Sequence, residues 1–177
     1  MATQIFVNLP VKDLKRSIEF FGSLGFEFNP QFTDETATCM IVAENIFVML
    51  LTEAKFRSFT PHPICDAKQS TEVLVCLSRD SRQAIDSMVG AALAAGGTTH
   101  SEPQDHGFMY AHAFQDLDGH IWELVHMSGM PGGASAARAI SRSTAERLWS
   151  SASASKALAA SRSAPARSGA SSACARW

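Results

Sequence analysis

Apolar and polar positions along the chain follow the same order twice: one strand pattern, one helix pattern and three further strand patterns. In the first copy, residues 4–11 alternate as a strand. Apolar residues then recur at helical spacing behind Asp13, a residue type that caps helices, and Gly25 ends this pattern. The next strand patterns cover residues 26–32, 37–42 and 46–51. The sequence therefore predicts a β-α-β-β-β unit.

The second copy follows a connector, residues 52–71, in which one short helical turn is expected around Phe56. Its helix pattern is capped by Asp80 or Ser81. Its strand patterns cover residues 72–77, 98–101, 108–115 and 120–126. Asp80 lies 67 residues after Asp13, and the order of the elements matches throughout. The chain therefore contains an internal repeat.

This repeat predicts an α+β fold of two β-α-β-β-β modules, at about residues 4–51 and 72–127, in a domain that covers residues 1–127. One module cannot cover the concave face of its own sheet. We therefore expect the two curved sheets to pair around a pocket.

The last two strand patterns meet at Asp118-Gly119, a strong hairpin signal because glycine adopts the positive φ that a tight turn needs. In the second of these strands, the period of two places Glu123 on one face with Ile121 and Val125, and Trp122 on the other. A carboxylate between apolar neighbours either faces a cavity as a functional group or lies on a solvated sheet face. The residues alone leave both readings open.

Composition divides the chain into two parts. Residues 1–128 contain 8 Lys/Arg and 16 Asp/Glu, whereas residues 129–177 contain 7 Lys/Arg and one acid, with 27 Ala or Ser among 49 residues. The acidic part argues against nucleic acid as a partner, because phosphate binding needs clustered basic residues. The Ala/Ser/Arg-rich tail, residues 128–177, has no apolar period and is expected to be disordered.

The chain has no apolar N-terminal segment and no run of about 18 apolar residues, so neither a signal peptide nor a membrane span is expected. A cytoplasmic location follows as the expectation. The four cysteines show no paired metal spacing and are expected to be reduced. Of these, Cys39 and Cys76 are interpreted as small buried residues.

Several polar residues are candidates for ligand contact. Asn8 lies on an otherwise apolar strand and either lines the pocket or bonds to a neighbouring strand. Tyr110 and His112 share one strand face, where an imidazole suits ligand binding or acid–base work, although histidines on such faces are more often surface residues. His120, at the exit of the turn, and His126, at the strand end, are expected to be solvated.

Three motifs resemble a known family. They are VKDLKRSIEFF at residues 11–21, LGF at residues 24–26 and DLDGHIWEL at residues 116–124. They resemble the vicinal oxygen chelate superfamily, which includes glyoxalase I, bleomycin-resistance proteins and extradiol dioxygenases. The resemblance implies a glyoxalase-like fold around a small-molecule site. In the enzymes, a divalent metal at this site acts as a Lewis acid.

The resemblance places the family's metal-binding positions on Phe6, Met49, Leu74 and Glu123. Two of these side chains are hydrocarbons, and a thioether suits only a soft ion. We therefore expect no metal cofactor. If a divalent metal does bind, Glu123 and Glu72 are the expected ligands.

Two functions remain open after these observations. One is a lyase of the lactoylglutathione lyase type with a degenerate metal site, in which Glu123 is catalytic. The other is a metal-free protein that sequesters a small molecule, as bleomycin-resistance proteins do. A third function, that of an interaction protein that uses the tail, has less support.

The resemblance and the unpaired sheet edges also favour a homodimer. The residues expected to contact the small molecule are Phe6, Asn8, Met49, Leu74, Tyr110 and His112.

Overall fold

The computed structural model describes residues 3–128. The first module contains β1 (Ile5–Val11), α1 (Leu14–Ser23), β2 (Glu27–Asn29), η1 (Pro30–Phe32), β3 (Ala37–Ala43) and β4 (Ile46–Thr52). A connector with α2 (Glu53–Arg57) leads to the second module, which contains β5 (Leu74–Ser78), α3 (Arg82–Ala94), β6 (Gln104–Asp105), β7 (Met109–Gln115) and β8 (Ile121–Met127). The tail beyond residue 128 lies outside the described residues, so its disorder and the domain boundary stay predictions.

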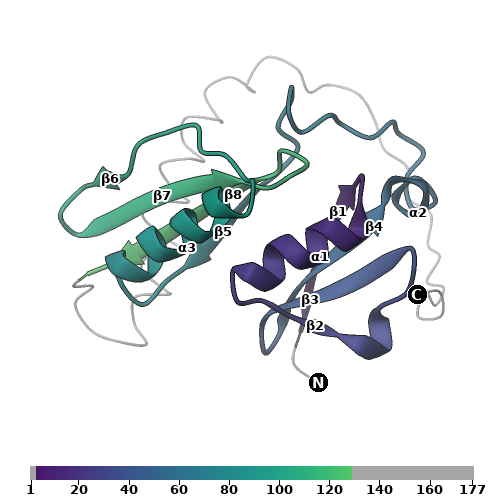
Figure 1. The fold of residues 1–177 in the computed structure, drawn as a ribbon, viewed down its shortest axis with the longest axis horizontal. Coiled ribbons are helices and arrows are strands. Elements are labelled where there is room, and N and C mark those ends of the chain that lie inside the picture. The colour runs from purple at the N-terminus through teal and green to yellow at the C-terminus, as the bar shows by residue number, and fades with distance from the viewer. Residues whose placement is uncertain (1–2, 129–177) are drawn as a thin grey trace, which may run out of the picture. The chain divides into compact units, whose positions relative to one another are not determined.

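The two modules share one topology (Figure 1). Their sheets have the strand orders β1-β4-β3-β2 and β5-β8-β7-β6. In each sheet the first strand pairs in parallel with the last, and the other pairs are antiparallel. The predicted α+β fold of two β-α-β-β-β modules is therefore confirmed. Among residues 3–128, no helix has the length and apolar character that crossing a membrane requires.

Both long helices begin at a side-chain cap. The Asp13 carboxylate accepts a hydrogen bond from the Arg16 N–H at 3.1 Å, and the Ser81 hydroxyl accepts one from the Ala84 N–H at 3.1 Å. The cap of α3 is therefore Ser81 and not Asp80. This sets the offset between the modules at 68 residues, one more than the sequence comparison gave.

Two of the predicted strands differ from the structure. The strand predicted at residues 26–32 stops at Asn29, because a 3₁₀-helix begins at Pro30. The strand predicted at residues 98–101 is only an isolated bridge between Thr98 and Gln115. The chain bends beyond it, where the Thr99 hydroxyl donates to the Ala113 carbonyl at 2.7 Å, and the short strand β6 forms later.

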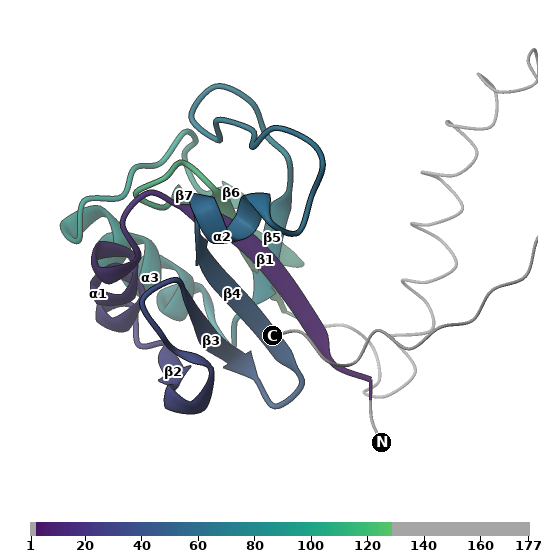
Figure 2. The same ribbon diagram turned by 90° about the vertical axis from the view of Figure 1, so that its right-hand side faces the viewer.

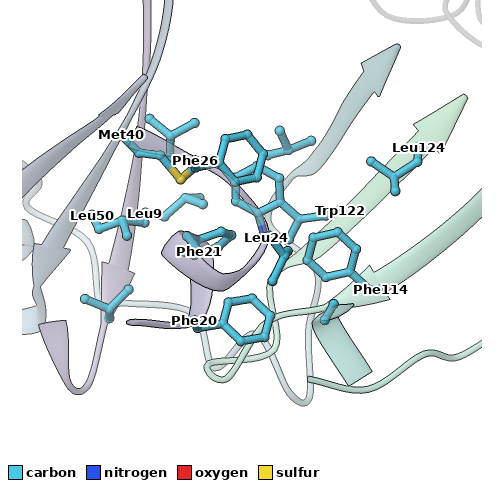
Figure 3. Close-up of a cluster of buried hydrophobic side chains, with 14 of the residues drawn as sticks. Leu9, Phe20, Phe21, Leu24, Phe26, Met40, Leu50, Phe114, Trp122 and Leu124 are labelled. Atoms are coloured by element: carbon cyan, nitrogen blue, oxygen red, sulfur yellow. The ribbon is translucent and has the colours of Figure 1, made fainter. Parts of the chain in front are cut away.

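One apolar core joins the two modules (Figure 3). Phe21 of α1 lies 5.0 Å from Trp122 of β8, and Trp122 stacks on Phe114 of β7, measured between ring centroids. Phe20 reaches the same Phe114 ring at 6.2 Å. Trp122 and Phe114 are fully buried. Because α1 contributes rings to the second sheet, the modules bury apolar surface against each other rather than separately.

Each sheet therefore has one face that packs against its helix and a second face turned away from α1 or α3, which we call the distal face. Side-chain alternation and strand register assign the residues. The distal face of the first sheet carries Phe6, Asn8, Ala37, Cys39, Phe47, Met49 and Leu51. That of the second carries Leu74, Cys76, Ala111, Ala113, Ile121, Glu123 and Val125. Helix α2 lies beside β1 and β4 (Figure 2), and its Phe56 packs against the first distal face.

Candidate ligand site on the distal sheet faces

Glu123 lies in the middle of the second distal face. Its direct neighbours across the strands are Ala113 on β7 and Cys76 on β5. A hollow of about 500 Å³ covers this part of the sheet and is lined by β7, β8 and the segment from His100 to Gln104. Glu123 is half-buried in the wall of this hollow. Of the two readings of Glu123, its position supports a carboxylate that faces a cavity.

Cys76 was expected to be a small buried residue, and the structure corrects this. Its side chain is exposed, because β5 is the edge strand of the second sheet and no helix covers its distal side. Although the residue is exposed, neighbouring atoms still exclude part of the water from its thiol; this partial desolvation raises the pKa of Cys76, and the charge of Glu123 raises it further. The pair therefore presents a neutral thiol beside a carboxylate. Cys39 is buried, as predicted.

The equivalent row in the first sheet is Asn8, Met49 and Cys39, on β1, β4 and β3. Phe6 stacks on Phe47 beside this row, with ring centroids 4.9 Å apart. The amide oxygen of Asn8 is buried and has no hydrogen-bond partner among the described residues. A buried acceptor without a hydrogen-bond partner, which we call an orphan acceptor, lowers the stability of the folded state, so its presence requires an explanation.

Tyr110 and His112 do not share the sheet face of Glu123, although His112 is among the residues that line the 500 Å³ hollow. His112 pairs with the core residue Leu124 across the strands, so its side chain lies on the helix face of the sheet. Tyr110 lies on the same face, and its hydroxyl donates to Asp86 of α3 at 2.7 Å. Both residues were grouped with Glu123 as expected ligand contacts. The strand register does not bring them to its face.

Phe6, Asn8 and Met49 lie on the distal face of the first sheet, and Glu123 lies on that of the second. The residues that line the 500 Å³ hollow all come from the second module. Leu74 lies on the same face as Glu123, at the edge strand, and is 52% exposed. We call the residues around Asn8 on the first distal face and those around Glu123 on the second the two half-sites.

The four residues on which the resemblance places the family's metal-binding positions do not fit a hard divalent ion. Phe6 and Leu74 offer only carbon, Met49 offers a thioether, and Glu123 alone offers oxygen ligands. Glu72, which was expected to be a second metal ligand if a metal binds, already interacts with His120, because its Oε1 lies 2.7 Å from His120 Nδ1. Among residues 3–128, no group of three His, Cys, Asp or Glu side chains is arranged to hold a metal ion.

His120 was expected to be solvated, and this expectation is wrong. The side chain is 3% exposed, because the hairpin turn folds back against the end of β1. His126 is half-buried, and its Nδ1 lies 3.0 Å from the Arg79 carbonyl oxygen. In a chain of two modules, the residue that follows a turn can face the other module. The pattern of polar and apolar residues around the turn does not reveal this.

The turn itself is organised by Asp116, a residue that sequence reasoning missed. Its Oδ1 accepts hydrogen bonds from the backbone N–H groups of residues 118, 119 and 120, each at 3.0 Å. Its Oδ2 accepts the indole N–H of Trp122 at 3.2 Å. Burial raises the pKa of this carboxyl, while the charge of His120 and the hydrogen bonds from Trp122 and the His120 N–H act in the opposite direction. An aspartate two residues before Asp-Gly was the available signal, since such residues often bond to the backbone of a turn.

Comparisons with known proteins agree with this geometry. A family model described as bleomycin resistance protein-like, N-terminal, matches residues 3–43. No curated protein matches the sequence.

Solved structures match most of the chain. A hypothetical protein from S. aureus is 25% identical, with a TM-score of 0.61 over 71% of this chain and 94% of that one. A glyoxalase-related enzyme from Fulvimarina pelagi is 17% identical, with a TM-score of 0.62 over 76% and 94%. A fosfomycin resistance protein from Listeria monocytogenes is 17% identical, with a TM-score of 0.53 over 75% and 96%.

Proposed function

We propose that this chain binds a small organic molecule on its distal sheet faces without a metal ion. Its fold and the family model over residues 3–43 support its resemblance to the vicinal oxygen chelate superfamily. The observation that carries the proposal is the donor set at the four metal positions. One carboxylate, one thioether and two hydrocarbon side chains cannot replace the water shell of Zn²⁺, Ni²⁺, Mn²⁺ or Fe²⁺.

The side chains of the two half-sites define the ligand. The first distal face offers the stacked pair of Phe6 and Phe47 and the orphan oxygen of Asn8. The hollow of the second face is lined by the carboxylates of Glu102 and Glu123 and by the imidazoles of His100 and His112, and its lining includes no lysine or arginine from the described residues. A flat, mostly apolar molecule that carries a cationic or hydrogen-bond-donating group complements both surfaces.

Metal-free bleomycin A2 has these features, a flat heteroaromatic end with a cationic tail, and is the probe for the first test. We expect isothermal titration of the full chain in EDTA to show binding that Glu123→Gln weakens by roughly tenfold or more, the loss of one charge-assisted hydrogen bond. Glu27→Gln, on the exposed edge strand β2, is the matched control and should leave the affinity unchanged. Equal affinity in both variants would remove Glu123 from the site.

The alternative function is a lyase of the lactoylglutathione lyase type, supported by the position of Glu123 on the closing strand. It is tested with methylglyoxal and glutathione in the presence of Ni²⁺, Zn²⁺ or Mn²⁺. The donor set predicts neither turnover nor a rise in melting temperature with any of these ions. Activity that EDTA abolishes and Ni²⁺ restores would favour the lyase over the binding protein.

We also propose that a second copy of the chain completes the site. The distal faces expose Leu74 and 43% of Phe6, and β1 and β5 are edge strands in their sheets. A two-fold partner that lays its first sheet over the second sheet of this chain would join the two half-sites. Sedimentation at micromolar concentration should give twice the chain mass. A chain that remains monomeric at tenfold higher concentration would contradict the paired site and leave each half-site to act alone.

A further inference from the structure

A second cavity lies outside the two half-sites. It has a volume of about 220 Å³ and is bounded by four segments, which are the end of β1, helix α2, the connector and the hairpin between β7 and β8. None of its lining residues lines the hollow around Glu123. The cavity is therefore a candidate site that is independent of the proposed function.

Hydrogen bonds hold the walls of this cavity in place. The Lys12 backbone N–H donates to Asp118 Oδ1 at 3.1 Å, which joins the end of β1 to the hairpin. In the connector, the Asp66 carboxylate accepts the Lys68 backbone N–H at 3.1 Å and the Gln69 side-chain amide at 3.0 Å. The walls are therefore ordered by contacts within the chain, as small-molecule sites usually are.

Charged side chains of both signs line the cavity. Lys12 contributes an ammonium group, and Asp66 and Asp118 contribute carboxylates. Arg57 also lines it and forms an ion pair of 2.6 Å with Glu53 of the same helix. Within the described chain, the Lys12 ammonium has no hydrogen bond or ion pair, and neither aspartate pairs with a cationic side chain. The cavity therefore presents a cation and two anions that do not neutralise one another.

The rest of the wall is partly apolar, and the volume is small. Pro10, Ile64 and Ala67 contribute hydrocarbon surface. The volume corresponds to about seven water molecules, which is close to the number of non-hydrogen atoms in a small amino acid. The cavity therefore matches a compact ligand that has charges of both signs and a short apolar part.

We propose that this cavity binds a small zwitterionic amino acid. The carboxylate of the ligand faces the Lys12 ammonium and the donors of Arg57 other than Nη2. Its ammonium group faces Asp118 and Asp66, and its short aliphatic side chain lies against Ile64. A purely cationic ligand leaves the lysine without a partner, and a purely anionic ligand faces both aspartates, so a zwitterion complements the lining best.

The first test uses L-alanine as the probe. We expect ¹H–¹⁵N correlation spectra of the full chain, titrated to about 20 mM ligand, to show a Kd of about 1 mM for a ligand of this size. The backbone signals of Lys12, Asp66 and Asp118 should shift together, and that of Glu123 in the hollow should not. No shift at the highest concentration, or shifts confined to the hollow, would overturn the proposal.

Two derivatives of the probe test the need for both charges. The methyl ester of L-alanine keeps the ammonium group and lacks the carboxylate, whereas N-acetyl-L-alanine keeps the carboxylate and lacks the ammonium group. Each should bind at least about tenfold more weakly than L-alanine, because each loses charge-assisted hydrogen bonds at one end. Equal affinity for either derivative would refute a zwitterion site.

Variants of the lining locate the site. Lys12→Gln and Asp118→Asn should each weaken L-alanine binding by about fivefold or more. Asp118→Asn keeps an oxygen that can accept the Lys12 N–H. Lys15→Gln and Asp80→Asn remove exposed charges outside the cavity, and these matched controls should bind as the wild type does. Wild-type affinity in both lining variants would contradict the proposal. If either variant fails to fold, the three ligands on the wild type still decide the matter.

Discussion

Replacing Asn8 with leucine should stabilise the protein and weaken its ligand binding. The amide oxygen of Asn8 is buried without a partner, beside Met49 and the apolar residues of the first distal face. Leaving a polar group in that state costs about 1–3 kcal/mol. Leucine has a similar branched shape and no polar atom, although its slightly larger volume takes back part of the gain. We expect a net rise of about 1 kcal/mol in the free energy of unfolding, or about 4 °C in melting temperature.

A buried polar residue that has its partner provides the control. Thr38 is fully buried, and its hydroxyl lies 2.8 Å from that of Thr33. Because the Thr33 hydroxyl already donates to the Asn29 carbonyl, Thr38 is the donor in this pair. Thr38→Val should therefore lower the stability by about 1 kcal/mol, the opposite sign to Asn8→Leu.

Chemical denaturation of both variants, with titration of metal-free bleomycin A2, checks the reasoning. If Asn8→Leu were destabilising by 1 kcal/mol or more, the Asn8 amide would have a structural role, and the orphan oxygen would no longer indicate a ligand. If it stabilised the protein and left the affinity unchanged, Asn8 would lie outside the binding site.

Three further substitutions test the structural argument. Asp116→Ala should destabilise the protein by about 3–5 kcal/mol in urea unfolding, since it removes the acceptor of four donors, most of them buried, and only the Gly119 N–H keeps another acceptor, the backbone carbonyl of residue 116. Asp118→Ala, whose carboxylate accepts one exposed N–H, should cost less than about 1 kcal/mol. Gly119→Ala should cost at least about 2 kcal/mol, because φ is +100° and a Cβ would meet the Lys68 backbone nitrogen at 2.8 Å; at Gly25, φ is +89° but the space is open, so alanine there should cost only about 1 kcal/mol. The pKa values of Asp34 and Asp105 are lowered, first of all by hydrogen bonds from the backbone N–H groups of Thr36 and Gly107. The stability that these two carboxylates supply is therefore present above about pH 4 and is lost as the pH falls through the lowered pKa values. The double variant Asp34→Asn, Asp105→Asn should reduce the loss of stability at acidic pH, and an unchanged loss would show that other groups cause it.

The sequence predicted most of the fold because its signals are local. The cap at Asp13, the glycine at the end of α1, the Asp118-Gly119 turn and the strand alternation around Glu123 each act within a few residues. The sequence did not predict the burial of a side chain that contacts a residue far away along the chain. His120 is buried by Pro10, which lies 110 residues away.

The candidate site shows the same division. Periodicity placed Glu123 and Ile121 on one face of β8 correctly. It could not give the register between β7 and β8, which sets Ala113 and not His112 opposite Glu123. The exposure of Cys76 depended on β5 being an edge strand, a property of the sheet order that one strand's sequence does not contain.

The aromatic cluster around Trp122 also gives the protein its own optical probe. Trp122 is the one tryptophan among residues 3–128, it is fully buried, and its indole touches Phe21 of the other module. Its emission should therefore be blue-shifted, and its near-ultraviolet circular dichroism should depend on how the two modules dock. With Trp149 and Trp177 replaced by phenylalanine, one fluorophore would report the joining of the modules in real time, without any attached label.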